Sequence, residues 1–178
     1  MSVISVLLYM ASIVAANLVT AKFHPISIGV LLVPAGTFFI GVSFLARNLV
    51  QGRYGKRKTY LAIAVATVIS AASEWWLSGT AMIVVASAIS FVLSESTDTE
   101  AYSRFRLTLP QRVLWSGSIA GVVDSAVFVI VGLSPVGVGY LTWAEVPYAI
   151  LGQLLVKTAV QALGALAVYY AQPTKDTT

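Results

Sequence analysis

The feature that most constrains this chain is a series of long apolar runs, each about the length of a membrane-crossing helix. Six runs occupy approximately residues 3–21, 28–50, 58–78, 80–98, 113–134 and 146–170. A helix needs about 20 mostly apolar residues to cross the hydrocarbon core of a bilayer. The runs are rich in Ala, Leu and Val and lack the two-residue alternation of strands. The sequence predicts an all-α integral membrane protein, a bundle of six transmembrane helices without strands.

Composition supports this class, because only 10% of the 178 residues are charged while 58% are hydrophobic. Soluble domains carry about 25% charged residues. The connections between the runs are short, so we expect a single transmembrane domain over 1–172 and a tail over 173–178. The first run lacks the basic flank of a signal peptide, and we read it as a retained helix.

The distribution of Lys and Arg predicts the orientation of the bundle, since basic loops stay on the cytoplasmic side. The connection 51–58 and the connection 99–112 hold most of the basic residues, and Lys175 lies in the tail. The opposite side has Lys22 and His24 together with several aromatic residues suited to the membrane interface. We therefore predict a multi-pass protein of the cytoplasmic (inner) cell membrane with both termini in the cytoplasm.

Ionisable residues within the runs need an explanation, since each costs about 2.5–3.5 kcal/mol at a helix centre. Asp124 and Lys157 lie about midway along the fifth and sixth runs, where they could form a neutralising pair. Gln153 and Gln161 flank Lys157 at four-residue spacing, which makes one polar stripe. A purely structural salt bridge is the alternative to a functional site.

The stretch VLSESTDTEAY, residues 92–102, places three carboxylates where the fourth run ends. Asp98 continues a face of serines toward the bundle interior, Glu95 lies one turn deeper, and we expect Glu100 to be solvent-exposed. Arg47, near the inner end of the second run, is the predicted basic neighbour of the two deeper acids. The alternatives are a wet helix end for the acids and snorkelling for Arg47.

Together these polar groups predict one central cavity with apolar walls. The candidate substrate-binding residues are Asn17, Arg47, Asn48, Glu95, Asp98, Ser116, Asp124, Gln153 and Lys157. Their mixed donors and acceptors suit a flat polar heterocycle. Carboxylates and amides can form hydrogen bonds with the edge of such a ring, as they do in the recognition of nucleic-acid bases. An amino acid or a small zwitterion would also fit.

Several functions lack the residues they need. The chain has no cysteine and a single histidine, which argues against thiol chemistry and a metal site. No nucleophile–base pair or metal-ligand spacing supports an enzyme. We expect no cofactor, and no nucleic-acid partner, because the basic residues fall in loops between membrane runs.

Five segments, in order along the chain, resemble the VUT family of vitamin-uptake-like and queuosine-precursor transporters. They are ANLVTAKF (16–23), FLARNLVQGRYGKR (44–57), ASAISFVLSESTDTEAYSRFR (86–106), SGSIAGVVDSAVFV (116–129) and GQLLVKT (152–158). The resemblance is closest to the short forms of actinobacteria and their phages. It implies a six-helix bundle resembling the substrate-binding subunits of energy-coupling-factor transporters.

The resemblance also implies uptake of 7-cyano- or 7-aminomethyl-7-deazaguanine by facilitated or secondary transport. The nine candidate residues fall on the polar positions of the family. Two positions depart from the pattern: Asn48 stands where the family often has Asp, and Gly117 stands where it often has Asn.

Two other functions stay open at this point. The chain could be the capture subunit of an energy-coupling-factor vitamin transporter, docking through the small residues Ala11 and Ala15. It could also be a non-transporting structural membrane protein. The expected partners are a deazapurine substrate and the lipid bilayer, with a homodimer as a further option.

Overall fold

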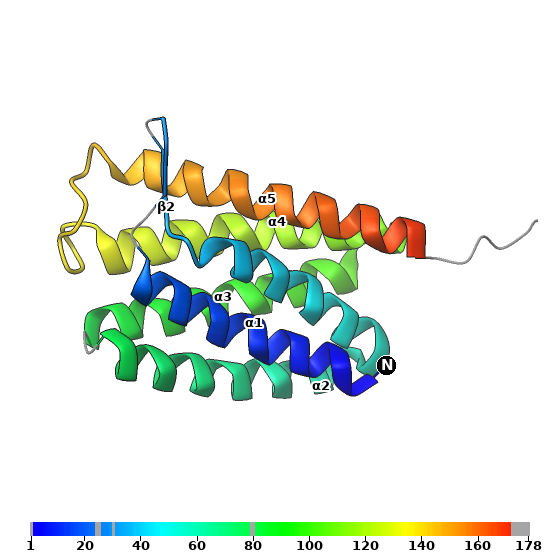
Figure 1. The fold of residues 1–178 in the computed structure, drawn as a ribbon. Coiled ribbons are helices and arrows are strands. Elements are labelled where there is room, and N and C mark those ends of the chain that lie inside the picture. Colours follow the sequence, from blue (N-terminus) through cyan, green and yellow to red (C-terminus); the bar gives the residue numbers. More distant parts are fainter. Residues whose placement is uncertain (1, 24–25, 30, 79–80, 172–178) are drawn as a thin grey trace, which may run out of the picture.

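The computed structural model describes residues 2–23, 26–29, 31–78 and 81–171, which form a lengthwise bundle of helices (Figure 1). The helices are α1 (Ser2–Lys22), α2 (Thr37–Ser78), α3 (Ala81–Arg104), α4 (Leu109–Val127), the π-helix η1 (Phe128–Leu133) and α5 (Val146–Ala171). Two short strands, β1 (Ile26–Ile28) and β2 (Leu31–Val33), connect α1 to α2. The predicted tail over 173–178 lies outside the described residues.

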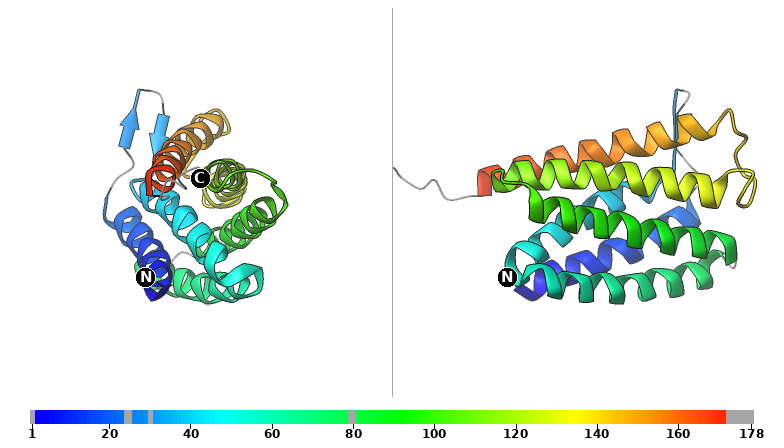
Figure 2. Two further views of the ribbon diagram at one scale, coloured as in Figure 1. Left: turned by 90° about the vertical axis from the view of Figure 1, so that its right-hand side faces the viewer. Right: turned by 180° about the vertical axis from the view of Figure 1, so that it is seen from behind.

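Helix α2 is two helices joined at a sharp bend. Its 42 residues would extend about 63 Å as one helix, roughly twice the thickness of the bilayer core. At Gly55 the backbone leaves helical geometry, with φ 77° and ψ 169°, a conformation that favours glycine. The chain reverses there, so the arms 37–54 and 56–78 run in opposite directions along the bundle and diverge from the bend (Figure 2). They correspond to the second and third predicted runs.

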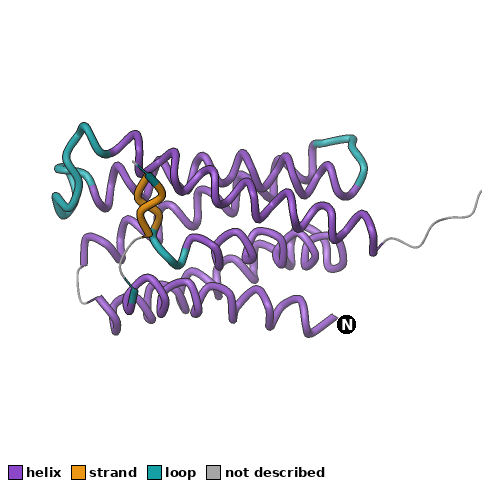
Figure 3. The backbone as a smooth tube through the Cα atoms, turned by 45° about the horizontal axis from the view of Figure 1, so that its top comes forward, coloured by secondary structure: helices purple, strands orange, loops and turns teal. Residues whose placement is uncertain are grey.

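The prediction that a helix begins at residue 28 and that strands are absent is wrong. β1 and β2 pair antiparallel, with Ile26 opposite Val33 and Ile28 opposite Leu31. Gly29 lies in the turn with φ 61°. Pro34 disfavours helical backbone at the residue before it, so α2 begins only at Thr37. The hairpin projects from the bundle near the connection between η1 and α5 (Figure 3).

Other helix boundaries also differ from the prediction, and α4 begins at Leu109, four residues before the expected start. Helix α3 continues to Arg104, six residues beyond the expected end, so Glu100 is a helical residue that pairs with Lys56 at 2.7 Å. The fifth run ends as the π-helix η1, whose wider turns shift the residues after Phe128 relative to α4. Single π-helical turns are frequent at functional sites.

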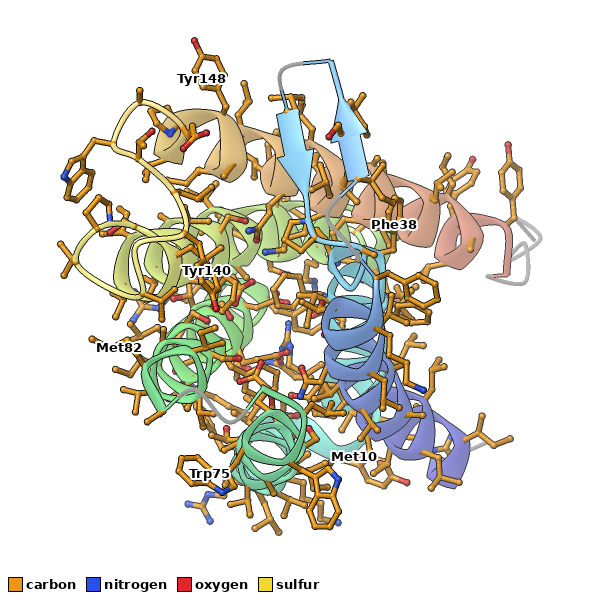
Figure 4. The ribbon with its side chains drawn as sticks, turned by 60° about the vertical axis from the view of Figure 1, so that its left-hand side comes forward. Met10, Phe38, Trp75, Met82, Tyr140 and Tyr148 are labelled. Atoms are coloured by element: carbon orange, nitrogen blue, oxygen red, sulfur yellow. The ribbon has the colours of Figure 1, made fainter. Side chains whose placement is uncertain are left out.

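The bundle exposes many large apolar side chains and buries polar groups among its apolar core residues. Among the described helices, four are long and apolar enough to span a membrane, and Ile4–Thr20 is a shorter apolar helix. Phe38, Trp75 and Tyr148 point away from the bundle (Figure 4). Arg47 is the largest of the fully buried side chains, and Lys157 is also buried. The chain is thus an integral membrane helical protein whose interior holds ionisable groups.

The two ends of the bundle differ in charge. The bend of α2, with Arg53, Lys56 and Arg57, lies at the same end as the start of α1 and the end of α5 (Figure 1). The opposite end carries the hairpin and the connection that follows η1. This agrees with the predicted grouping of basic residues on one side.

Candidate functional site

A cavity of about 70 Å³ lies within the bundle, toward the end that carries the hairpin. Its polar lining comes from five helices and includes Asn17 on α1, Ser70 and Glu74 on α2, Ser87 and Ser90 on α3, Asp124 on α4, and Gln153 and Lys157 on α5. Phe91 on α3 and Phe128 on η1 supply aromatic surface. One water needs about 10–15 Å³ on this measure, so the cavity holds roughly five to seven water-sized groups.

Asp124 and Lys157 form the charged floor of this cavity, as their matching depths predicted. The Lys157 ammonium lies 2.6 Å from Asp124 Oδ2, 2.9 Å from Ser125 Oγ and 3.1 Å from Gln153 Oε1. Three partners use all three N–H groups of the ammonium. Helices α4 and α5 lie in contact at Gly121, where a Cβ would lie 3.6 Å from the Lys157 Cβ.

Gln153 lines the cavity and carries a buried amide N–H group. Its Oε1 accepts the hydrogen bond from Lys157, which fixes the orientation of the amide. Gln153 Nε2 is buried and has no hydrogen-bond partner among the described residues. A buried N–H group without a partner costs free energy, so this donor is suited to an acceptor on a ligand.

Asn17 joins α1 to the second arm of α2. Its amide nitrogen donates to Ser70 Oγ at 3.2 Å and to Ser73 Oγ at 2.7 Å. Asn17 therefore forms hydrogen bonds between helices and also lines the cavity. Its donors are occupied, which leaves Gln153 as the better donor to a ligand.

Glu74 is a cavity residue that the sequence reasoning missed. It lies on the second arm of α2, and its Oε1 accepts a hydrogen bond of 2.7 Å from Ser87 on α3. The sequence SEWWLSG placed it next to Trp75 and Trp76, which indicated an interfacial position. A carboxylate four residues before the end of an apolar run was the available signal.

A second polar cluster, Arg47 with Glu95 and Asp98, lies deeper in the bundle and does not line the cavity. Arg47 Nε is 2.8 Å from Glu95 Oε2, and Arg47 NH2 pairs with Asp98 Oδ2. All three side chains are 0% exposed. The prediction that Arg47 is the neighbour of these acids is confirmed, and snorkelling of Arg47 is excluded.

Polar neighbours complete the shell around the Arg47 guanidinium. NH1 donates to Gln51 Oε1 at 2.7 Å and to Thr99 Oγ1 at 3.1 Å, and NH2 donates to Asn48 Oδ1 at 2.9 Å. Gln51 and Thr99 were not among the predicted residues. Ser116 on α4 is fully buried, and its hydroxyl faces Asp98.

The structure thus divides the predicted single cavity into two layers. Asn17, Asp124, Gln153 and Lys157 belong to the cavity, whereas the predicted residues Arg47, Asn48, Glu95, Asp98 and Ser116 form the deeper cluster. For Glu95 and Asp98, substrate contact stays a prediction, because in this conformation their oxygens face Arg47. Among the described residues, no group of His, Cys, Asp and Glu has the arrangement of a metal site.

An open groove of about 830 Å³ lies on the far side of the cluster, at the basic end of the bundle. Arg53, Lys56 and Arg112 line it, together with Asn48 and Gln51. The last two residues also hydrogen-bond with Arg47. The cluster therefore separates the cavity at one end from the groove at the other.

A family model described as "Putative vitamin uptake transporter" matches residues 71–171, which are 101 of the 178 residues. The chain belongs to this family. No curated protein and no solved structure matches it. The matched range runs from the second arm of α2 through α5, so it contains Glu74, Glu95, Asp98, Asp124 and Lys157. Membership of the vitamin uptake transporter family agrees with a multi-pass membrane protein and with a role in transport rather than catalysis.

Proposed function

We propose that this member of the vitamin uptake transporter family takes up a queuosine precursor, 7-cyano- or 7-aminomethyl-7-deazaguanine, as a facilitator or secondary transporter. The observation that supports this most is the lining of the cavity, which combines carboxylates, amides and one ammonium with Phe91 and Phe128. A flat heterocycle would place its faces against the aromatic rings and its polar edge against the charged groups.

The hydrogen bonds that the cavity residues already make indicate which of them would contact each polar group on the edge of the substrate. Gln153 Nε2 has no partner among the described residues, so it would donate to the ring carbonyl of the substrate. Glu74 and Asp124 would accept hydrogen bonds from the ring N–H and the exocyclic amine. A cavity of about 70 Å³ is smaller than a bicyclic ring with its hydration, so binding requires the helices to separate. The π-helix η1 begins at Phe128, in the cavity wall, where it can permit this shift.

The orientation and span count belong to the same proposal. We propose six crossing segments within residues 1–172, counting the two arms of α2 separately, in the inner cell membrane with both termini in the cytoplasm. The grouping of basic residues at the bend of α2 supports this, as does the bend itself at Gly55. The cavity would then open toward the outside and the basic groove toward the cytoplasm.

Substrate binding by the purified protein tests the proposal. We expect 7-deazaguanines, but not guanine or a panel of vitamins, to raise the melting temperature by linkage. Glu74→Gln and Gln153→Ala should each reduce that shift, while Glu100→Gln, on the surface of α3, should leave it unchanged. A shift produced only by a vitamin, or equal shifts in both cavity variants and wild type, would rule out this substrate assignment.

A capture subunit of an energy-coupling-factor transporter is the second candidate. The observation that favours it is the small, exposed Ala11 on α1, which leaves room for a partner helix. Copurification with a coupling protein and ATPases, and its loss in Ala11→Leu, would support this function in place of autonomous uptake.

A further inference from the structure

The cluster of Arg47, Glu95 and Asp98 contains one cation and two carboxylates, all with side chains that are 0% exposed. With every group ionised, it would carry a net charge of −1 inside the bundle. An uncompensated buried charge is unfavourable, and membrane proteins pair such groups or neutralise them. The question is therefore what compensates the second carboxylate.

Arg47 has no further N–H group to offer. A guanidinium carries five N–H donors. NH1 uses two on Gln51 and Thr99, NH2 uses two on Asn48 and Asp98, and Nε faces Glu95. These contacts occupy all five N–H donors of the guanidinium. Glu95 Oε1 and Asp98 Oδ1 are buried, receive no N–H group from Arg47 and form no hydrogen bond of good geometry among the described residues.

The neighbouring helices add hydroxyl groups but no second cation. Tyr9 on α1 faces Glu95, and Ser116 on α4 faces Asp98. Tyr102 on α3 and Tyr60 on α2 are more distant titratable groups. The next cation, Lys157 on α5, has all its N–H groups directed to Asp124, Ser125 and Gln153. Within the described part of the chain, Arg47 is the one cation in ion-pair contact with these two acids.

We propose that the cluster binds one proton, shared between Glu95 and Asp98, and that this proton is the coupling ion of transport. The proton on one carboxyl oxygen brings the net charge of the cluster to zero. It also turns one carboxyl oxygen that has no contact with Arg47 into a donor, and a facing hydroxyl can accept the resulting hydrogen bond. The coupling rests on the transport function proposed above, whereas the proton site does not.

The position of the cluster suits this role. Ser94, next to Glu95 on α3, donates to the cavity residue Asp124 at 3.4 Å. On the other side, Asn48 and Gln51 connect Arg47 to the basic groove. A proton would come from water on the cavity side, remain on the cluster while the bundle is closed, and leave to water in the groove. Loss of the proton restores the charge of −1, which favours entry of water and opening of the inner half.

Infrared spectroscopy of the purified protein tests the proton site without any substrate. A protonated carboxylic acid has a carbonyl stretch separate from that of a carboxylate. We use a Glu74→Gln background, so that the cavity acid does not contribute. At neutral pH this background should show the band of one buried protonated carboxyl. Glu95→Gln and Asp98→Asn should each abolish it, because the remaining acid then pairs with Arg47 as a carboxylate.

The matched control is Glu100→Gln, which removes an acid from the same helix at a partly exposed position and should leave the band unchanged. Absence of the band in the background, or its survival in both cluster variants, overturns the proton site. The cluster variants remove charge and keep volume, so we expect them to fold.

Coupling is tested by uptake of 7-cyano-7-deazaguanine into proteoliposomes. A proton gradient directed inward, with the outside more acidic than the lumen, should accelerate uptake by wild type. It should have no effect on uptake by Glu95→Gln or Asp98→Asn. If wild type binds no deazaguanine yet shows the band, the proposed substrate fails and the proton site stands. If uptake occurs and ignores the gradient in wild type, the coupling role is overturned.

Discussion

Substitution of Gly117 by alanine tests how closely α4 and α5 pack beside the candidate site. A Cβ at this position would lie 2.5 Å from Gln161 Oε1 and 2.6 Å from Gln161 Cδ. The Gln161 side chain cannot swing away freely, because it is fully buried and donates to the Gly41 carbonyl of α2 at 2.8 Å. The new methyl group must therefore separate the helices or break this hydrogen bond.

Overpacking costs about 1–3 kcal/mol, and orphaning a buried hydrogen-bonding group costs about 1–3 kcal/mol. Alanine recovers about 1 kcal/mol through its higher helix propensity. Because the steric and hydrogen-bonding costs together exceed the gain in helix propensity, we expect Gly117→Ala to lower the free energy of unfolding by about 2 kcal/mol.

Gly121→Ala is the matched control, one turn along the same helix. Its Cβ would meet Lys157 Cβ at 3.6 Å, an ordinary contact. We expect this variant to be neutral or up to about 1 kcal/mol more stable. The free energy of unfolding of the detergent-solubilised protein, measured by reversible SDS titration, checks both variants. Equal stability of Gly117→Ala and Gly121→Ala would refute the close packing described here.

Three further predictions concern buried and capping charges. Lys157→Met leaves Asp124 without the ammonium 2.6 Å away and should cost about 3–5 kcal/mol in unfolding free energy, whereas adding Asp124→Asn should restore most of it. Arg47→Met leaves the two buried acids, Glu95 and Asp98, without their cation, so the protein should fail to elute as a monodisperse species, unlike Glu95→Gln. The backbone N–H and hydroxyl of Thr142 donate to Glu145 and lower the pKa of that loop carboxyl. The resulting stability is present above the ordinary pKa of about 4.3 and is lost as pH falls through the folded value, so wild type and Glu145→Gln should differ at neutral pH and converge in acid.

The pairing of charges across helices was predictable from depth alone. Asp124 and Lys157 lie midway along their runs, so any antiparallel packing of those helices brings them to one level. Arg47 and Asp98 lie near the same end of their runs in the same way. Ion pairs follow, because a lone charge in the bundle is costly and the depth leaves few partners.

The separation into two layers could not be predicted in the same way. The position of a residue in the helical repeat determines which face of the helix it occupies. It does not determine the axial offset between neighbouring helices. That offset depends on the bend at Gly55, the hairpin before Thr37 and the close contacts at Gly117. The hairpin was missed because its apolar residues merge with the following run.

Asn48 and Gly117, the two positions that the resemblance led us to expect as departures from the family, both lie against polar side chains. Asn48 Oδ1 accepts a hydrogen bond of 2.9 Å from Arg47 NH2, so it supplies an acceptor as Asp would. An Asp at this position would add a third carboxylate to a cluster that already has two for one cation, and the amide avoids that charge.

At the second position, a side chain from the neighbouring helix fills the space. Gln161 on α5 extends to Gly117 on α4, and its amide oxygen lies 2.5 Å from the point where a Cβ would be. An Asn at 117 would collide with the Gln161 side chain. Gly117→Asn should thus be tolerated only when Gln161 is also shortened, for example to Ala.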